Sequence, residues 1–460
     1  MVSETNSLAS FPPLSPFTYS DGNAAVKRTQ APPVGKIAVA ATLVGLAFFG
    51  ASNSIVPMAQ NGLGKVLREN ASPPSSAASV EGWASRIGAP APFKRSFTGY
   101  AGADARLSLL VGFFASLIDD PGAGWDAWAL YAWAATQLAA GWTALVLEGR
   151  RAGNRGRAVV SWIAALGVLF QILSWTLIVP LWLAAHLFLS PVARLGQGKK
   201  QYGSEAARER GDEARKALFV YLWDLALIPL AVTLTFIAPT IAMSLPRLLG
   251  HSAATHYNLI AFWQAFPVWT ILTLSVLHNA CYFLFGSLSP QDNSGRPTSL
   301  GKGFLTATAG VYQFGLTVSS AAHAPLLAIS LLPAGARAAL AAAVPPRLAP
   351  VVEQVAFARA FAVSAPLSID PTAYGSGDLS PLVVRFLQYD LYTGGAALLL
   401  WAFYLNRSTA GSRVGWGRAL GTTALWGLVG GPAAATLALL WQRDEIVREG
   451  EEEDETKKRT

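Results

Sequence analysis

The sequence is poor in cysteine and in charged residues. Its single cysteine, Cys281, lies within an apolar run, which excludes an intrachain disulfide framework and a metal site built from several cysteines. Charged residues make up 13% of the 460 residues, against about 25% in soluble domains, whereas 52% are hydrophobic. Mean hydropathy is +0.37. This balance predicts a polytopic membrane protein.

The motifs of several common enzyme classes are also missing. The chain has no phosphate-binding Gly-Lys-Ser/Thr loop, no His-Glu-x-x-His and no Gly-x-Ser-x-Gly. These absences argue against nucleotide hydrolases, zinc proteases and serine hydrolases. The net charge is +8, but basic and aromatic residues do not interleave as they do on nucleic-acid-binding surfaces. We therefore expect the lipid bilayer, and no nucleic acid, as a partner.

Apolar runs of helical length recur along the chain and divide it into three parts. We expect a disordered polar tail at 1–35, a multi-helix transmembrane domain at 36–442 and a charged, solvated tail at 443–460. The predicted fold class is an all-α polytopic integral membrane protein with eight or nine transmembrane helices. The eight expected spans are 37–58, 125–147, 158–189, 217–245, 259–285, 303–332, 382–405 and 417–441, and 105–118 is a possible ninth.

Two of the predicted segments carry further local expectations. Pro180 lies inside the 32-residue run 158–189, so this helix should kink or continue along the membrane interface. The loop 333–380 contains an alanine-rich stretch at 337–344 that favours a short surface helix. Lys and Arg occur on both sets of alternating loops, so the charge distribution does not predict which side of the membrane each loop faces.

An acidic residue interrupts the apolar run 386–405. Asp390 follows Gln388 and Tyr389 in the first turns of this run. An ionised carboxylate at bilayer depth costs on the order of 2.5–3.5 kcal/mol on insertion scales. Such a residue is paired, neutralised or used in the function. The alternative is an Asp near the headgroup boundary that is solvated and orients the helix.

A second group of acidic residues ends the run 105–118. Asp119 and Asp120 are adjacent, and Asp126 follows after a Pro-Gly-Ala-Gly turn. Paired aspartates on a helix hold Mg²⁺ in prenyl enzymes that cleave diphosphates. Here Pro121 breaks the helix, and no second aspartate-rich motif is present to hold a bridged diphosphate. The other interpretation is a polar turn with a helix-capping Asp.

Further polar residues share faces of predicted helices. Asp224 lies early in the span 217–245, and His278 shares a helix face with Ser275. Tyr312 and His323 share another face. Such groups either hydrogen-bond one another between packed helices, at about 0.6 kcal/mol each, or line a polar pocket at membrane depth. The tryptophans that could complete an apolar pocket are Trp223, Trp263, Trp269 and Trp401.

The order of several short motifs resembles one family. The motifs are Phe113-Phe114 followed by Asp119, the stretch 258–269 (Asn-Leu-Ile-Ala-Phe-Trp-Gln-Ala-Phe-Pro-Val-Trp), Val311-Tyr312 with His323, and Phe386-Leu-Gln-Tyr-Asp390. Together they resemble the ascofuranone/macrophorin-type membrane-bound terpene cyclases of filamentous fungi. The resemblance covers most of the membrane domain. It departs from the family at Asp120, where a small residue such as Gly is expected.

The resemblance implies a reaction that needs a buried acid. It implies cyclisation of a farnesyl chain, or of its terminal epoxide, attached to a phenolic or quinone-like head in a meroterpenoid pathway. Protonating an alkene or epoxide requires a carboxyl that holds its proton at neutral pH, as it does in an apolar environment. Aromatic faces stabilise the carbocation by roughly 0.5–2 kcal/mol per contact. No diphosphate leaves, so we expect no metal and no cofactor.

The leading hypothesis is therefore an integral-membrane terpene cyclase, located in the endoplasmic reticulum, whose substrate is an apolar isoprenoid. We expect Asp390, or alternatively Asp119, to be the general acid, and the other carboxyl or His323 to orient it or take the final proton. The residues expected to contact the substrate are Trp263, Gln264, Tyr312, Gln388, Tyr389, Asp224 and His278. The rival hypotheses are a transporter that uses the buried carboxylates and histidines, and a non-catalytic membrane scaffold.

Overall fold

The computed structural model describes residues 34–71, 93–119, 124–195, 213–245, 251–288, 302–346, 348–368, 379–410 and 415–459. Within these ranges the chain is helical and contains no β-strand. Seven helical segments are long and apolar enough to cross a membrane. The predicted all-α, multi-pass fold class is thus confirmed. The expected tail 1–35 lies outside the described residues, apart from two residues that begin the first helix.

The helices follow the predicted apolar runs closely. They are α1 (Val34–Gln60), α2 (Leu63–Ala71), α4 (Ala101–Ile118), α5 (Gly124–Arg150), α6 (Ile163–Leu173), α7 (Trp175–Leu189), α9 (Leu222–Val232), a π-helical turn η3 (Thr233–Ile237), α10 (Ala238–Ser244), α12 (Ala253–Gln264), α13 (Phe266–Phe285), α14 (Lys302–Leu331), α15 (Ala334–Ala343), α16 (Ala349–Gln354), α17 (Phe357–Ala360), α18 (Ser380–Ala410) and α19 (Trp416–Arg459). The helix expected at 337–344 is present as α15.

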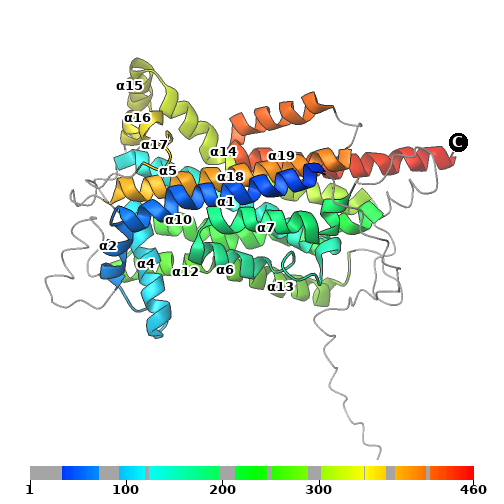
Figure 1. Cartoon of the computed structure of the whole chain (residues 1–460), viewed down its shortest axis with the longest axis horizontal. Coiled ribbons are helices and arrows are strands. Elements are labelled where there is room, and N and C mark those ends of the chain that lie inside the picture. The colour runs from blue at the N-terminus through cyan, green and yellow to red at the C-terminus, as the bar shows by residue number, and fades with distance from the viewer. Residues whose placement is uncertain are drawn as a thin grey trace, which may run out of the picture.

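Helix α18 lies in the middle of the bundle. It packs against α1, α5, α7 and α19, and Figure 1 shows these long helices side by side. The helices α2, α15, α16 and α17 gather at one end of the molecule, whereas the C-terminal part of α19 extends beyond the other end. Helix α18 is not among the seven apolar segments, because its first half carries Gln388 and Asp390. Its neighbours shield these polar residues, since both are buried.

The apolar run 158–189 is broken at Ser174, six residues before Pro180. Ser174 has φ 128° and ψ 145° and separates α6 from α7. Pro180 lies within α7, one turn or more after the helix begins, and does not end it. A non-glycine residue at such a φ is strained by roughly 1–3 kcal/mol, and surrounding contacts must hold it in place. Those contacts come from α18 and are described below.

The span expected at 259–285 is also interrupted. Helix α12 ends at Gln264 and α13 begins at Phe266, with Ala265 at φ −92° and ψ 13° between them. Pro267 lacks the N–H that a continuous helix would need at this point. This break places Trp263 and Gln264 at a helix end inside the bundle, where both side chains are buried.

The last predicted span, 417–441, reverses direction at Gly431, which has φ 78°. Before the reversal, the ring of Trp416 lies 5.9 Å from that of Phe403 on α18. After it, Asn406 Nδ2 donates a hydrogen bond of 2.9 Å to the Leu439 carbonyl. Residues 416 and 439 therefore lie beside the same part of α18, and the two limbs of α19 form a V (Figure 1). Length and composition place α19 among the seven apolar segments, but its path is not one straight span.

Gln137 on α5 satisfies the backbone that this reversal exposes. Its Nε2 donates to the Gly430 carbonyl at 2.9 Å, and its Oε1 accepts from the Ala433 N–H at 3.1 Å. His323 Nε2 donates to the Leu428 carbonyl at 3.1 Å. Irregular backbone is tolerated at membrane depth only where protein groups replace the missing helical hydrogen bonds. These two side chains on α5 and α14 are what allow the helix to break.

The final helix continues past the expected end of the membrane domain. Position 442, where we expected a solvated tail to begin, lies inside α19. Arg443 and Asp444, the first residues of that tail, are 0% and 2% exposed. Their partners on α5 and α14 are described with the site.

Candidate active site

Asp390 lies at the centre of the bundle with one oxygen held and the other free. Its Oδ1 accepts a hydrogen bond from Ser174 Oγ at 2.7 Å and one from the Thr176 backbone N–H at 2.9 Å. In the described part of the chain, no residue donates to Oδ2 and no cation pairs with this carboxyl. The side chain is buried, with 7% of the residue exposed. A carboxyl of this kind can carry a proton on Oδ2 while Oδ1 fixes its orientation.

The same contacts explain the break between α6 and α7. The first N–H groups of a helix have no partner within that helix. Asp390 supplies an acceptor for the N–H of Thr176 in the first turn of α7, and it also fixes the strained Ser174. The N-terminal end of a helix carries a partial positive charge that favours a carboxylate. The break thus places two hydrogen-bond donors and a helix N-terminus next to the carboxyl of Asp390.

Asp119 forms a second polar pair, with a histidine that sequence reasoning missed. Asp119 is the C-cap of α4, and its Oδ2 lies 2.8 Å from His256 Nε2 on α12. The side chains of Asp119 and His256 are 5% and 0% exposed. His256 Nδ1 is buried and has no hydrogen-bond partner in the part of the chain that the structure describes. Asp120 lies outside the described residues, and Asp126 is bound elsewhere, to the Ala356 N–H at 2.7 Å.

Four aromatic residues form a continuous series of ring contacts, which we call the aromatic path: Phe113 and Phe114 on α4, Trp263 on α12 and Phe386 on α18. The ring centroids of Phe113 and Phe386 are 5.3 Å apart, those of Phe113 and Phe114 are 5.5 Å apart, and those of Phe114 and Trp263 are 5.0 Å apart. All three pairs are edge-to-face. Phe386 precedes Asp390 by one helical turn, so the path meets the acid on one face of α18.

Trp263, which is part of the path, and Gln264, which follows it in sequence, are both predicted to bind substrate but differ in their contacts. Trp263 Nε1 donates to Thr240 Oγ1 at 2.8 Å, which fixes the plane of the indole ring. Gln264 Nε2 donates to the Ile260 carbonyl at 3.3 Å, but its Oε1 is buried without a partner. A buried amide oxygen without a donor is costly, at about 1–3 kcal/mol.

Gln388 and Tyr389 turn away from Asp390. Gln388 Nε2 donates to the Ala360 carbonyl at 3.0 Å, and the Tyr389 hydroxyl donates to the Ser364 carbonyl at 2.6 Å. The carboxyl of Asp390 is held by Ser174 and Thr176, and not by these two neighbours. Gln388 and Tyr389 tie α18 to the segment that follows α16.

His323, the predicted partner of the acid, has both ring nitrogens engaged. Its Nδ1 accepts from Trp133 Nε1 at 2.8 Å, and its Nε2 donates to the Leu428 carbonyl. These contacts place His323 beside the reversal of α19. They connect it neither to Asp390 nor to Asp119 among the residues that the structure places.

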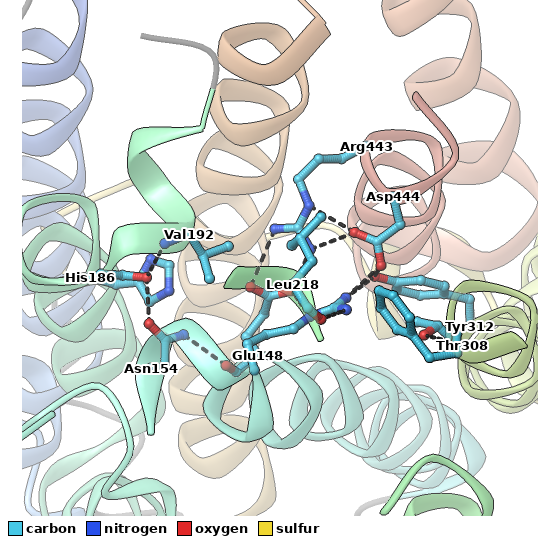
Figure 2. A network of polar contacts seen from close by, with 12 residues as sticks. Glu148, Asn154, His186, Val192, Leu218, Thr308, Tyr312, Arg443 and Asp444 are labelled. Atoms are coloured by element: carbon cyan, nitrogen blue, oxygen red, sulfur yellow. Dashed lines mark hydrogen bonds and ion pairs between the residues drawn. The ribbon is translucent and has the colours of Figure 1, made fainter. Parts of the chain in front are cut away.

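Tyr312 belongs to a buried ionic network that joins α5, α14 and α19 (Figure 2). Arg443 Nη2 lies 2.6 Å from Glu148 Oε1 and 2.8 Å from Asp444 Oδ1. Arg151 Nη2 lies 2.5 Å from Asp444 Oδ2 and donates to the Tyr312 hydroxyl at 2.9 Å. Burial alone would lower the pKa of Arg151, but Asp444, Tyr312 and Glu148 outweigh it and raise that pKa. Two guanidinium groups and two carboxylates balance in charge here.

Asp224 and His278, which we expected to line the pocket, form a separate cationic cluster. His278 Nδ1 lies 2.8 Å from Asp224 Oδ1, and Arg155 and Arg150 approach Asp224 Oδ2 at 3.4 and 4.0 Å. Burial lowers the pKa of Arg155, although Asp224 opposes this shift. The guanidinium of Arg155 lies over the Tyr221 ring at 3.9 Å. The structure thus connects these two predicted residues to each other.

The described residues contain no group of three or more His, Cys, Asp or Glu side chains that could hold a metal ion. Together, these features define a multi-pass, all-α protein with a buried carboxyl free of cation partners, an aromatic path and a carboxylate–histidine pair.

Comparison with known proteins places the chain in a family. The CtvD domain matches residues 39–448, so the chain belongs to the CtvD-domain family. It is 27% identical over 361 residues to the terpene cyclase ascI of Acremonium egyptiacum, an alignment that covers 76% of this chain and 80% of that protein. No solved structure matches the chain. The predicted resemblance to fungal meroterpenoid terpene cyclases is confirmed.

Proposed function

We propose that the protein is an integral-membrane terpene cyclase that protonates a farnesyl chain, or its terminal epoxide, on a phenolic or quinone-like head. The observation that carries this proposal is Asp390, a buried carboxyl with one oxygen fixed, the other free and no cation partner among the described residues. The similarity of the whole chain to a terpene cyclase supports the proposed class of reaction. An apolar isoprenoid substrate partitions into the bilayer, where a membrane enzyme can reach it. We also propose that the protein is located in the endoplasmic reticulum membrane.

The first step is a proton transfer from Asp390. The proton on Oδ2 passes to the terminal alkene carbon, or to the epoxide oxygen as its C–O bond opens. The resulting carboxylate keeps the hydrogen bonds from Ser174 and Thr176 and faces the N-terminus of α7. Preorganised donors of this kind stabilise charge as it develops. The new carbocation is attacked by the next double bond, which forms the ring.

The aromatic path then stabilises the cation and excludes water. Phe113 and Trp263 are buried, and Phe114 and Phe386 are partly buried beside them. Each ring face contributes roughly 0.5–2 kcal/mol toward a nearby cation. For Trp263, which is part of this path, and for Gln264, which follows it in sequence, we propose contacts with the substrate. For Gln388 and Tyr389 we propose a supporting role, in which they hold α18, and for Tyr312, Asp224 and His278 a role in holding the helices around it.

The test is an assay of microsomes from a heterologous host on farnesylated phenols with a terminal alkene or a terminal epoxide, with and without EDTA. We expect a cyclised isomer of unchanged mass whose formation is insensitive to EDTA, because no diphosphate leaves. Asp390→Asn should lower turnover at least 100-fold. Asp126→Asn is the matched control, because Asp126 pairs with Arg359 near the protein surface. Full activity in Asp390→Asn would refute the assignment.

A transporter is the second candidate, and the reversal of α19 favours it. Broken helices near the middle of the membrane form ion and substrate sites in many transporters. Here, however, Gln137 and His323 occupy the backbone groups at the break. Accumulation of labelled substrate in proteoliposomes, without any change in the compound, would favour this candidate over the cyclase.

A further inference from the structure

Beyond the acid, the proposed cyclisation needs a base, and we propose that His256 Nδ1 is that base, with Asp119 as its positioning residue. This inference rests on the proposed cyclase function. It assigns the final proton acceptor to a residue other than His323 or a carboxyl. The proton that His256 removes comes either from a carbon next to the final carbocation, which becomes an alkene, or from a substrate hydroxyl whose oxygen bonds to that carbocation.

The first argument is the hydrogen bonding of the imidazole ring. His256 is 0% exposed, and its Nε2 lies 2.8 Å from Asp119 Oδ2. A carboxylate can only accept, so in the neutral ring Nε2 carries the hydrogen and Nδ1 keeps its lone pair. Nδ1 is buried and has no partner. An acidic residue that fixes the tautomer of a basic histidine is the arrangement found in catalytic triads.

The second argument is that the other histidines lack this combination. His323 uses both ring nitrogens. His186 also has a buried Nε2 without a partner, but its Nδ1 accepts from Trp401, so Nε2 must carry the hydrogen and cannot take another. His278 shares its carboxylate with two arginines. His251 also has a buried ring nitrogen without a partner, but no carboxylate contacts its ring in the described part of the chain. A carboxylate on one ring nitrogen together with a buried, unpaired second nitrogen is therefore found only at His256 among the described histidines.

The third argument is position. His256 precedes Trp263 by seven residues on α12, which is two turns, so both lie on nearly the same helix face. Asp119 follows Phe114 at the end of α4. The pair thus stands on the two helices that carry one end of the aromatic path, whereas Asp390 stands on α18 at the other end. An acid and a base separated by aromatic rings match a reaction that begins and ends with a proton transfer.

The proton balance of the reaction is closed by this pair. Asp390 gives one proton to the substrate at the start, and His256 Nδ1 takes one proton as the last C–H or O–H bond breaks and an alkene or ether forms. The product is an isomer of the substrate. The enzyme is left with a carboxylate at Asp390 and an imidazolium at His256, which Asp119 stabilises. Before the next turnover, His256 loses its extra proton to solvent and Asp390 takes one up from solvent.

The test compares His256→Gln with the wild type in the microsomal assay over a range of pH. Glutamine places its amide N–H near the position of Nε2, so it keeps the donor to Asp119 and removes the base. We expect a 10²- to 10⁴-fold loss of the native cyclic product and a rise in water-trapped, hydroxylated products. The rising limb of the pH–rate profile should also disappear. Asp119→Asn should change the same limb.

His251→Gln is the matched control, because His251 also has a buried ring nitrogen without a partner and lies just before α12. Folding is checked from the elution profile and thermal unfolding of each detergent-solubilised variant. If the wild type is active and His256→Gln keeps both its product ratio and its pH profile, the assignment of His256 is wrong and the cyclase proposal stands. If His256→Gln unfolds, a normal pH profile in folded Asp119→Asn overturns the assignment. If the wild type turns over neither substrate, both proposals fail.

Discussion

Replacing Arg443 by Met should destabilise the protein more than replacing Arg443 and Glu148 together. Arg443 is 0% exposed and contacts Glu148 at 2.6 Å and Asp444 at 2.8 Å. With Arg443 and Arg151 present, the network of two cations and two anions is neutral. Arg443→Met leaves one uncompensated negative charge in a fully buried site. Breaking such a pair costs roughly 3–5 kcal/mol.

The double variant restores the balance. Glu148→Gln combined with Arg443→Met leaves Arg151 and Asp444 as a pair at 2.5 Å, still joined to Tyr312. A buried ion pair replaced by neutral groups of similar volume is often close to neutral in stability. We therefore expect the double variant to lie within about 2 kcal/mol of the wild type.

The assay is thermal unfolding of the detergent-purified protein, followed by tryptophan fluorescence. At roughly 2 °C per kcal/mol for a large chain, Arg443→Met should lower the apparent Tm by about 6–10 °C and the double variant by less than about 4 °C. Arg448→Met, at a side chain 29% exposed on the same helix, is the control and should stay within about 1 kcal/mol. If the double variant falls as far as Arg443→Met, the reasoning on buried charge is refuted.

Two further predictions concern close packing and the α19 reversal, and thermal unfolding tests both. Gly50→Ala should destabilise the protein by at least 1–3 kcal/mol, about the cost of overpacking, because its Cβ would lie 1.7 Å from Thr176 Oγ1. Gly45→Ala is the control and should have little effect, because no atom lies within 4 Å of its Cβ. Equal Tm values for the two variants would contradict this prediction. Gln137→Leu should lower the free energy of unfolding by about 1–3 kcal/mol for each backbone group left unpaired, and wild-type stability would contradict the proposed role of the Gln137 amide. Gly431→Ala should also be destabilised, because alanine is strained at a φ of 78°, and wild-type stability would contradict that reasoning.

The positions of the helices followed from local sequence, but their breaks did not. An apolar run predicted α14 within a few residues, because an apolar segment of helical length is removed from water as a helix. The alanine-rich stretch predicted α15, because alanine has the highest helix propensity. The break at Ser174 depends on Asp390, more than 200 positions away, and the reversal at Gly431 depends on Gln137. No local pattern contains these pairings. Pro180 lies inside α7 and does not end it, whereas the end of α6 coincides with a tertiary contact from Asp390 to Ser174.

The candidate site divides in the same way. By itself, the sequence determined that Asp390 and Asp119 are acidic residues in or beside apolar segments, where a carboxyl is costly and needs a reason to be present. Only the tertiary structure decided which groups meet them. It paired Asp119 with His256, left one oxygen of Asp390 free and directed His323 to the α19 reversal. It also buried Arg443 and Asp444, which look like a solvated tail in sequence. The physical reason is that composition sets the cost of burying a charge, whereas its compensation comes from partners distant in the chain.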